Sequence, residues 1–318
     1  MYARHMLSAD PDYSRRILCI VFAVVLSITA GCSPDEKPKK VSLYAKSEAG
    51  AHRLHSPKPN TLWFGFDLRL GPKEEISIYS PFLKYLESST GNRFRIKFTK
   101  DYEDTVGNLG NGSTHFAALG TLSYVIGEKK YGIKYLVSGV NSEGDARYHA
   151  MIVVPPDSDI QTIADIAGRC FAFGSNMSTQ GHLIPRKMLE DGGVTLDRLK
   201  KYFYAGSHSN AVKAILNREC DAAGLQDTLA NRLAAEGKLR IIKISEPYPS
   251  SVIAYNNSID AAIVQTVRKA LLEFEPQGRN KDQMYDWDRT EMPLGFTGIS
   301  ELELQKVRVL AERYDLLQ

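Results

Sequence analysis

The feature that most constrains the fold is a regular alternation of short apolar runs with amphipathic stretches, which begins at Leu62. The run LWFGF over 62–66 predicts a strand, and the following pattern predicts a helix over 81–89. A second series starts at Tyr148, and its first strand is the apolar run AMIVV over 150–154. Each repeat is about 25 to 30 residues long, the length of a strand–helix–strand unit. The pattern predicts an α/β fold with two mostly parallel sheets flanked by helices.

The pattern changes after Pro247 and Pro249. Two long amphipathic helices are predicted there, but no further series of strands accompanies them. We therefore expect the chain to return to the first domain. Crossings near Asp145 and near Val252 would form a two-strand hinge beside a cleft. The predicted lobes are 60–146 plus 254–318, and 147–253.

Composition limits the partners of the folded part. The 318 residues suffice for two domains, and 40 basic residues face 37 acidic ones, a formal net charge of +3. This balance, with no long basic run, argues against a nucleic-acid partner. No Cys-x-x-Cys spacing or histidine cluster predicts a metal site, and we expect no cofactor. We expect a monomer.

The N-terminal segment predicts export. Arg15 and Arg16 precede an apolar run over 17–30 that is short for a membrane span and typical of a signal peptide. The run ends at Cys32 in a sequence that resembles a bacterial lipobox, with Thr29 where an aliphatic residue is usual. A plain signal peptide cut near Ala30 and an uncleaved anchor are the alternatives. We predict a signal peptide over 1–31, a lipid on Cys32, and a location on the periplasmic side of the cell envelope.

The stretch that follows Cys32 is predicted to be a flexible linker over 32–59, because it is rich in Ser, Pro and Lys with little apolar periodicity. The lipid on Cys32 would hold the protein at the membrane, and the linker would let the folded part stand away from the surface.

Two loops rich in hydrogen-bond donors follow neighbouring strands of the second series. The first is GSNMSTQG over 174–181, where Ser178 and Thr179 stand at a helix start, and the second is GSHSN over 206–210, with His208. Free backbone N–H groups and hydroxyls at a helix start can cradle an anion, although an ordinary Ser or Thr N-cap has the same sequence. Parallel strands bring both loops to one sheet edge, where α/β folds bind ligands. His208 would donate a hydrogen bond, and would add charge if protonated.

These motifs belong to longer stretches with a family resemblance. ALGTLSYVIGEKKYG, the segment SGVNSEGDARYHAMIVVPPDSDIQTIADIAGRCFAFGSNMSTQGHLIPRKMLEDGG, FYAGSHSNAVKAILNRECDAAGLQDTLANRL and GFTGISELELQKVRVLAE resemble the phosphate/phosphite/phosphonate-binding subunits of ABC importers. The resemblance runs in order over roughly residues 60–318. It implies the type II periplasmic binding fold, in which two lobes close over the ligand. It also implies ligand-binding roles for Tyr124, Ser178, Thr179, Gln180, His208 and Asp227.

Several positions depart from the family pattern. Asp67 and Leu68 follow the first strand where a small residue and a proline are usual, and Thr121 replaces a proline three residues before Tyr124. The crossover over 248–251 (YPSS) lacks the aspartate that aminophosphonate binders place there. The identity of the oxyanion therefore stays open.

The same fold would place Cys170 and Cys220 at the same edge of neighbouring strands. Adjacent strands are about 4.8 Å apart, a spacing compatible with a disulfide. An oxidising compartment favours that bond, and two buried free thiols are the alternative.

The function expected from the sequence is capture of a small phosphorus oxyanion (phosphonate, phosphite or phosphate) for the membrane permease of an ABC importer. One alternative is a ligand sensor that feeds a signalling partner, and another is a binder of a sulfonate or an arsenic oxyanion. A hydrolase with Ser178 as nucleophile, His208 as base and Asp227 as orienting group is a further alternative. No nucleophile-elbow motif is present, so we expect a binding protein and not an enzyme.

Overall fold

A computed structural model describes residues 60–298 and 301–317. The predicted signal peptide, Cys32 and the linker lie outside these described residues. Within the two ranges, no helix is both long enough and apolar enough to cross a membrane.

The first of two main sheets has six strands in the order β13-β4-β12-β3-β1-β2. Parallel pairing joins β1 to β2 and β3, whereas β12 pairs antiparallel with both β3 and β4. The strands are β1 (Thr61–Phe66), β2 (Arg93–Ile96), β3 (Phe116–Leu119), β4 (Lys134–Gly139), β12 (Val252–Tyr255) and β13 (Phe296–Thr297).

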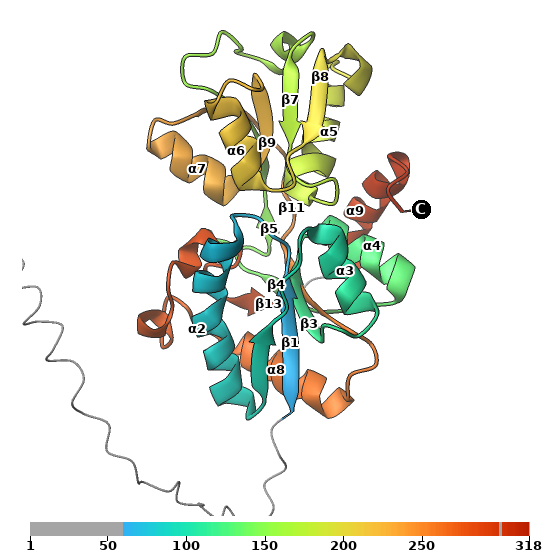
Figure 1. The fold of residues 1–318 in the computed structure, drawn as a ribbon, viewed down its shortest axis with the longest axis vertical. Helices are drawn as coiled ribbons and strands as arrows, with labels where there is room; N and C mark the ends of the chain where they lie inside the picture. Colours follow the sequence, from blue (N-terminus) through green and yellow to red (C-terminus); the bar gives the residue numbers. More distant parts are fainter. Residues whose placement is uncertain (1–59, 299–300, 318) are drawn as a thin grey trace, which may run out of the picture. The chain divides into compact units, whose positions relative to one another are not determined.

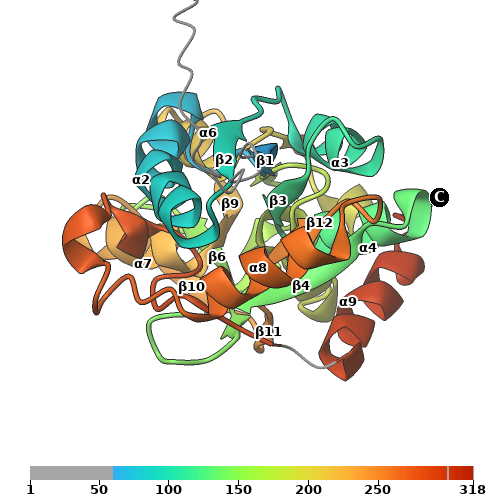
Figure 2. The same cartoon turned by 90° about the horizontal axis from the view of Figure 1, so that it is seen from below.

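Helices from both ends of the described chain cover this first sheet, as Figures 1 and 2 show for α2 and α8. They are α2 (Pro72–Thr90), α3 (Tyr102–Gly110), α4 (Thr121–Tyr131) and α8 (Ala261–Leu272), with short 3₁₀ turns at Lys281–Gln283 and Trp287–Arg289, whereas α9 (Glu301–Arg313) packs on α4 and on β11 (Tyr248–Pro249). Phe82 of α2 is fully buried, and its ring centroid lies 4.8 Å from that of Trp287 and 5.2 Å from that of Phe274. The C-terminal segment thus completes the core of the first lobe.

The second sheet has five strands in the order β10-β6-β9-β7-β8. Its strands are β6 (Ala150–Val154), β7 (Cys170–Phe173), β8 (Lys201–Tyr204), β9 (Ala222–Gln226) and β10 (Arg240–Ile244). Its helices are α5 (Ile184–Asp191), α6 (His208–Leu216) and α7 (Asp227–Ala235), with 3₁₀ turns at Ile163–Ile166 and Leu196–Arg198 and a π-helical turn at Thr179–Leu183.

A short antiparallel ribbon lies between the two sheets in Figure 1. It consists of β5 (Arg147–Tyr148) and β11 (Tyr248–Pro249). Each strand lies where the chain passes from one sheet to the other, which is the geometry of a hinge.

The predicted α/β fold of two sheets flanked by helices is confirmed, and two details add to it. Both sheets are mixed, because β12 runs antiparallel between β3 and β4, and β6 runs antiparallel between β9 and β10. The lobe boundary predicted after residue 253 falls inside β12, and all four residues of that strand pair within the first sheet.

A disulfide joins Cys170 and Cys220, with their Cα atoms 4.8 Å apart. Cys170 begins β7 and Cys220 lies just before the adjacent strand β9. The bond closes a loop of sequence separation 50. In the chain-entropy description, closing a loop of that size stabilises the fold by about 4 kcal/mol.

Candidate functional site

The Ser178 loop starts from the end of β7 and turns into the π-helical segment before α5. The Ser178 Oγ accepts a hydrogen bond from the Gly181 N–H at 2.9 Å and lies 3.4 Å from the His208 Nε2. A Cβ on Gly181 would lie 2.9 Å from both the Ser178 Oγ and the His208 Cε1, so only glycine permits this approach. The structure therefore brings the two predicted donor loops together.

His208 is the first residue of α6 and is almost fully buried, with 1% of its surface exposed. Burial lowers the pKa of its imidazole to about 3, and the nearby Arg69 guanidinium adds to that effect. In this arrangement His208 is therefore neutral at pH 7 and adds no positive charge. Its Nδ1 has no hydrogen-bond partner among the described residues.

Thr179 meets the start of α4 across the two lobes. Its Oγ1 accepts a hydrogen bond from the Leu122 N–H at 2.8 Å and lies 3.2 Å from the Thr121 Oγ1. The Thr121 Oγ1 also lies 2.8 Å from the hydroxyl of Tyr148 in the ribbon strand β5. The first N–H groups of a helix have no partner inside the helix, so this is a place where an anion is favoured.

Asp67 follows β1 and also reaches the start of α4. Its Oδ2 accepts a hydrogen bond from the Gly120 N–H at 2.8 Å, whereas its buried Oδ1 has no partner among the described residues. Gly120 lies between polar groups of the two lobes and leaves little room for a side chain. A Cβ at this position would lie 3.3 Å from the Thr179 Oγ1 and 3.6 Å from the Asp67 Oδ2. Burial raises the pKa of the Asp67 carboxyl to about 7.

Arg69, two residues further on, is a buried cation at the same junction. Its Nη2 lies 3.5 Å from the Glu291 Oε2 and donates a hydrogen bond to the Ser251 Oγ at 3.2 Å. Ser251 also donates to Glu291. The carbonyl oxygen of Arg69 accepts a hydrogen bond from the Ser209 N–H of α6 at 3.2 Å, which joins the two lobes. We call the polar residues that meet at this junction the interlobe cluster: Asp67, Arg69, Thr121, Ser178, Thr179 and His208.

Gln180 and Asp227 lie together on the second lobe. Their hydrogen bonds go to each other and to the backbone, and not to the interlobe cluster. The Asp227 carboxylate accepts hydrogen bonds from the N–H groups of His149 and Thr228, at 2.8 and 2.7 Å. The Gln180 Nε2 donates to the His149 carbonyl oxygen at 2.9 Å and to the Asp227 Oδ1 at 3.3 Å. Burial raises the pKa of Asp227. These contacts brace the starts of α7 and β6.

Tyr124 is buried in α4, and its hydroxyl donates to Glu128 of the next turn at 2.7 Å. In this arrangement, Thr121 and Leu122 make the hydrogen bonds from α4 to Thr179. A contact between Tyr124 and the ligand stays a prediction.

The serine-hydrolase arrangement is not assembled. His208 approaches Ser178, but the carboxylate of Asp227 accepts from His149 and Thr228, and the His208 Nδ1 lacks a partner among the described residues. The orienting contact that a catalytic triad requires is therefore missing. In the described ranges, no group of three or more His, Cys, Asp or Glu side chains is placed to hold a metal ion.

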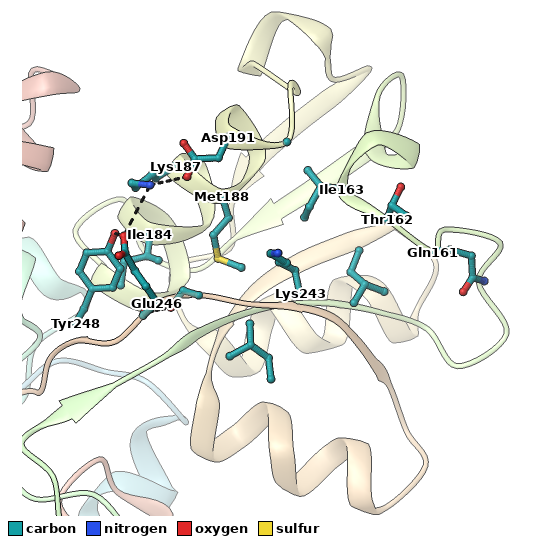
Figure 3. Close-up of a pocket in the computed structure, with 14 residues that line it drawn as sticks. Gln161, Thr162, Ile163, Ile184, Lys187, Met188, Asp191, Lys243, Glu246 and Tyr248 are labelled. Carbon is teal, nitrogen blue, oxygen red and sulfur yellow. Dashed lines mark hydrogen bonds and ion pairs between the residues drawn. The ribbon is translucent and has the colours of Figure 1, made fainter.

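Two of the cavities in the described part of the chain lie near the candidate site or carry charged residues, and neither is lined by a residue of the interlobe cluster. One of about 410 Å³ is lined by both lobes and contains Asp227, His149 and Glu291. The other, of about 510 Å³, lies on the second lobe beside α5 and β10. Figure 3 shows Lys187 at its edge, bonded to Asp191 and Glu246, so this cation is already paired within the protein. No residue of the interlobe cluster lines that second cavity.

This geometry can be compared with known proteins. A family model for the periplasmic substrate-binding proteins of phosphonate ABC transporters matches residues 64–300. The chain belongs to this family. Family members are binding components of transporters, and the two-lobed structure described above is their type II periplasmic binding fold.

The phosphate-import protein PhnD of Mycolicibacterium smegmatis is 26% identical to this chain over 206 residues. The match covers 60% of the chain and 64% of that relative's length. PhnD1 of Prochlorococcus marinus in complex with methylphosphonate has a similar structure, with a TM-score of 0.73, 15% identity, and coverage of 81% of this chain and 99% of that one. The alkanesulfonate-binding protein SsuA of Xanthomonas axonopodis, bound to MOPS, has a TM-score of 0.62 and 17% identity to this chain. That match covers 83% of this chain and 96% of SsuA. The two structures show a shared fold.

Arg69 and Glu291 were not predicted from the sequence as site residues, and Asp67 was given no role. The unusual Asp67-Leu68 pair after the first strand was the one local signal. Nothing local marks Glu291, which brings an acid to Ser251 in the crossover that carries no acid of its own.

Proposed function

We propose that this chain captures a small phosphorus oxyanion in the interlobe cluster and delivers it to the membrane permease of an ABC importer. The observation that carries this proposal is the convergence of donors from both lobes at one buried place. Ser178, Thr179 and His208 come from the second lobe, and the start of α4 and Arg69 from the first. Such fixed donors can replace the hydration shell of an anion.

Entry of the ligand requires the lobes to separate. The side chains of the cluster are buried, and Thr179 takes the Leu122 N–H that an oxyanion oxygen would otherwise accept. We propose that the β5–β11 ribbon is the hinge of this motion and that the closed, loaded form docks on the permease. The bound oxyanion would then join the two lobes through donors from each.

The cavity of about 410 Å³ supports a ligand with a substituent on phosphorus. It is lined by both lobes and shares Glu291 with the surroundings of Arg69. A phosphonate oxyanion held by the cluster could extend its carbon substituent toward this space. Bare phosphate or phosphite would leave it to water.

We propose acylation of Cys32 and a monomer anchored on the periplasmic side of the cell envelope. The apolar run over 17–30 and the Gly31-Cys32 pair that follows it support the anchor. A Cys32→Ala chain should move from the membrane fraction to the soluble fraction. Retention of that variant in the membrane would contradict acylation as the anchor.

Two alternatives have support of a different kind. The shared fold with a sulfonate-binding protein keeps a sulfonate or another small anion as a second candidate ligand. A sensing role would use the same closure to signal to a partner protein. Deleting this chain distinguishes the two roles. Loss of ligand uptake in the deletion strain supports import, and unchanged uptake supports sensing.

The proposed function predicts selective thermal stabilisation by one class of anion. A chain starting at Pro59 is heated with phosphate, phosphite, methylphosphonate, 2-aminoethylphosphonate, sulfate, taurine or arsenite. A ligand at a hundred times its dissociation constant should add about 2.7 kcal/mol to the free energy of unfolding. Stabilisation by a phosphorus compound alone supports the proposal. Stabilisation by sulfate or taurine alone would replace the ligand class, and no stabilisation at all would contradict capture of these anions.

A further inference from the structure

We infer that Asp67 selects oxyanions that carry or accept a proton, because its free carboxylate oxygen shares one hydrogen with an oxygen of the bound ligand. The inference rests on the proposed function and extends it to a rule of specificity. It distinguishes a phosphonate from a sulfonate of nearly the same shape.

The position of Asp67 is fixed by the contact of one oxygen. Its Oδ2 accepts a hydrogen bond from the Gly120 N–H at 2.8 Å. The position that a Cβ of Gly120 would occupy lies within 4 Å of both that oxygen and the Thr179 Oγ1. The side chain is fully buried, yet its Oδ1 has no hydrogen-bond partner among the described residues. A buried carboxylate oxygen without a partner is costly, so a group that binds there should supply a hydrogen.

The charges that face Asp67 come from several elements. Arg69 lies on the same loop, and its positive charge lowers the pKa of Asp67, whereas the negative charge of Glu291 raises it. Other titratable groups around Arg69 are Glu75 of α2, whose pKa burial raises to about 7, Tyr79, Tyr102 of α3, and His208 of α6, which is neutral. The Ser123 hydroxyl, which donates to the Met177 carbonyl oxygen at 3.3 Å, is also close enough to lower the pKa of Asp67. Desolvation outweighs these effects and brings the pKa of Asp67 to about 7.

Such a carboxyl can share a proton with a phosphorus oxyanion in two equivalent ways. A carboxylate accepts the hydrogen of a P–OH group, or a protonated carboxyl donates to a P–O⁻ oxygen. A phosphonate loses its second proton near neutral pH and fits both descriptions. A sulfonate carries no proton at these pH values, so above pH 7 it would face an ionised Asp67 and be repelled.

The test compares methylphosphonate with methanesulfonate at pH 8, using the full-length chain purified in detergent. Titration calorimetry measures both affinities for the wild-type protein and for Asp67→Asn. The wild-type protein should prefer methylphosphonate by about 100-fold or more, the effect of one charged hydrogen bond made and one repulsion avoided. In Asp67→Asn the amide oxygen keeps the Gly120 contact and the NH₂ group takes the place of Oδ1. That group donates to an oxygen without a proton, so the preference should fall below about tenfold.

A measurement on the wild-type protein covers the case in which Asp67→Asn does not fold. At pH 8 both Asp67 and most of the methylphosphonate are ionised, whereas their complex holds one shared proton. Binding should therefore take up close to one proton, which titrations in two buffers of different ionisation enthalpy reveal.

The outcomes separate this inference from the proposed function. Tight methylphosphonate binding with no proton uptake, or with an unchanged preference in a folded Asp67→Asn protein, overturns the role of Asp67 and leaves phosphonate capture standing. Binding of neither ligand by the wild-type protein overturns both.

Discussion

Replacing Arg69 by methionine is expected to lower the free energy of unfolding at pH 8 by about 3 to 5 kcal/mol, because one partner of a buried ion pair is removed. Methionine keeps much of the volume of the side chain but leaves Glu291 and the Ser251 hydroxyl without their cation. Chemical denaturation of the ligand-free protein measures this loss.

The loss should depend on pH in a defined direction. The folded-state pKa values of Asp67 and Glu75 are about 7, above their ordinary values, so the folded state binds more protons and is favoured at low pH. Arg69 lowers both pKa values, and without it they rise further. The deficit of Arg69→Met should therefore shrink at pH 5.5 and grow as the pH rises through 7.

Two further variants sharpen this prediction. Arg95→Met, on the exposed face of β2, should change the stability by less than about 0.5 kcal/mol. The double variant Arg69→Met/Glu291→Gln removes both charges, and should be less destabilised than the sum of the single variants. An Arg69→Met protein as stable as the wild type at pH 8 would show that the buried pair does not hold the lobe junction together.

Replacing Thr179 by valine is expected to weaken binding of the phosphorus ligand by about 10- to 100-fold, the cost of one hydrogen bond to a charged group. Valine has nearly the same shape, so the loss comes from the hydroxyl that now meets Leu122 and Thr121. Titration calorimetry with the ligand found in the thermal screen gives the change in affinity.

Its matched control is Thr195→Val. Thr195 is an exposed threonine of the second lobe whose side chain makes no capping hydrogen bond. The Thr195→Val protein should bind the phosphorus ligand with an affinity within about twofold of the wild-type value. Wild-type affinity in a folded Thr179→Val protein would remove Thr179 from the site.

Local patterns predicted much of this fold, and long-range pairing explains where they failed. The apolar run over 62–66 became β1, and the Ser178–Thr179 start of a helix was located correctly. The predicted helix from Thr179 forms, but its first turn over Thr179–Leu183 is π-helical and runs directly into α5, where Pro185 has no N–H to donate to the preceding turn. Strand β4, which follows α4 directly, was missed because its neighbours in the sheet are the distant strands β12 and β13.

The candidate site was predictable only where its chemistry is local. Ser178, Thr179 and His208 stand in loops that carry their own donors, and the structure brings them together. Arg69 and Glu291 are far apart in the sequence, and each resembles an ordinary surface charge until the fold buries both. Asp67 drew notice as an unusual residue, but its free oxygen is a property of the assembled lobes.

A crystal structure of the protein grown with methylphosphonate would show whether the interlobe cluster holds the ligand. We predict phosphonate oxygens within about 2.7 to 3.2 Å of donor atoms of Ser178, Thr179 and Arg69, with one oxygen at the Asp67 Oδ1. The lobes should close over the ligand with the α4 N–H groups facing it. Methylphosphonate bound elsewhere on the chain, with the Thr179 hydroxyl still accepting the Leu122 N–H, would show that the interlobe cluster is not the binding site.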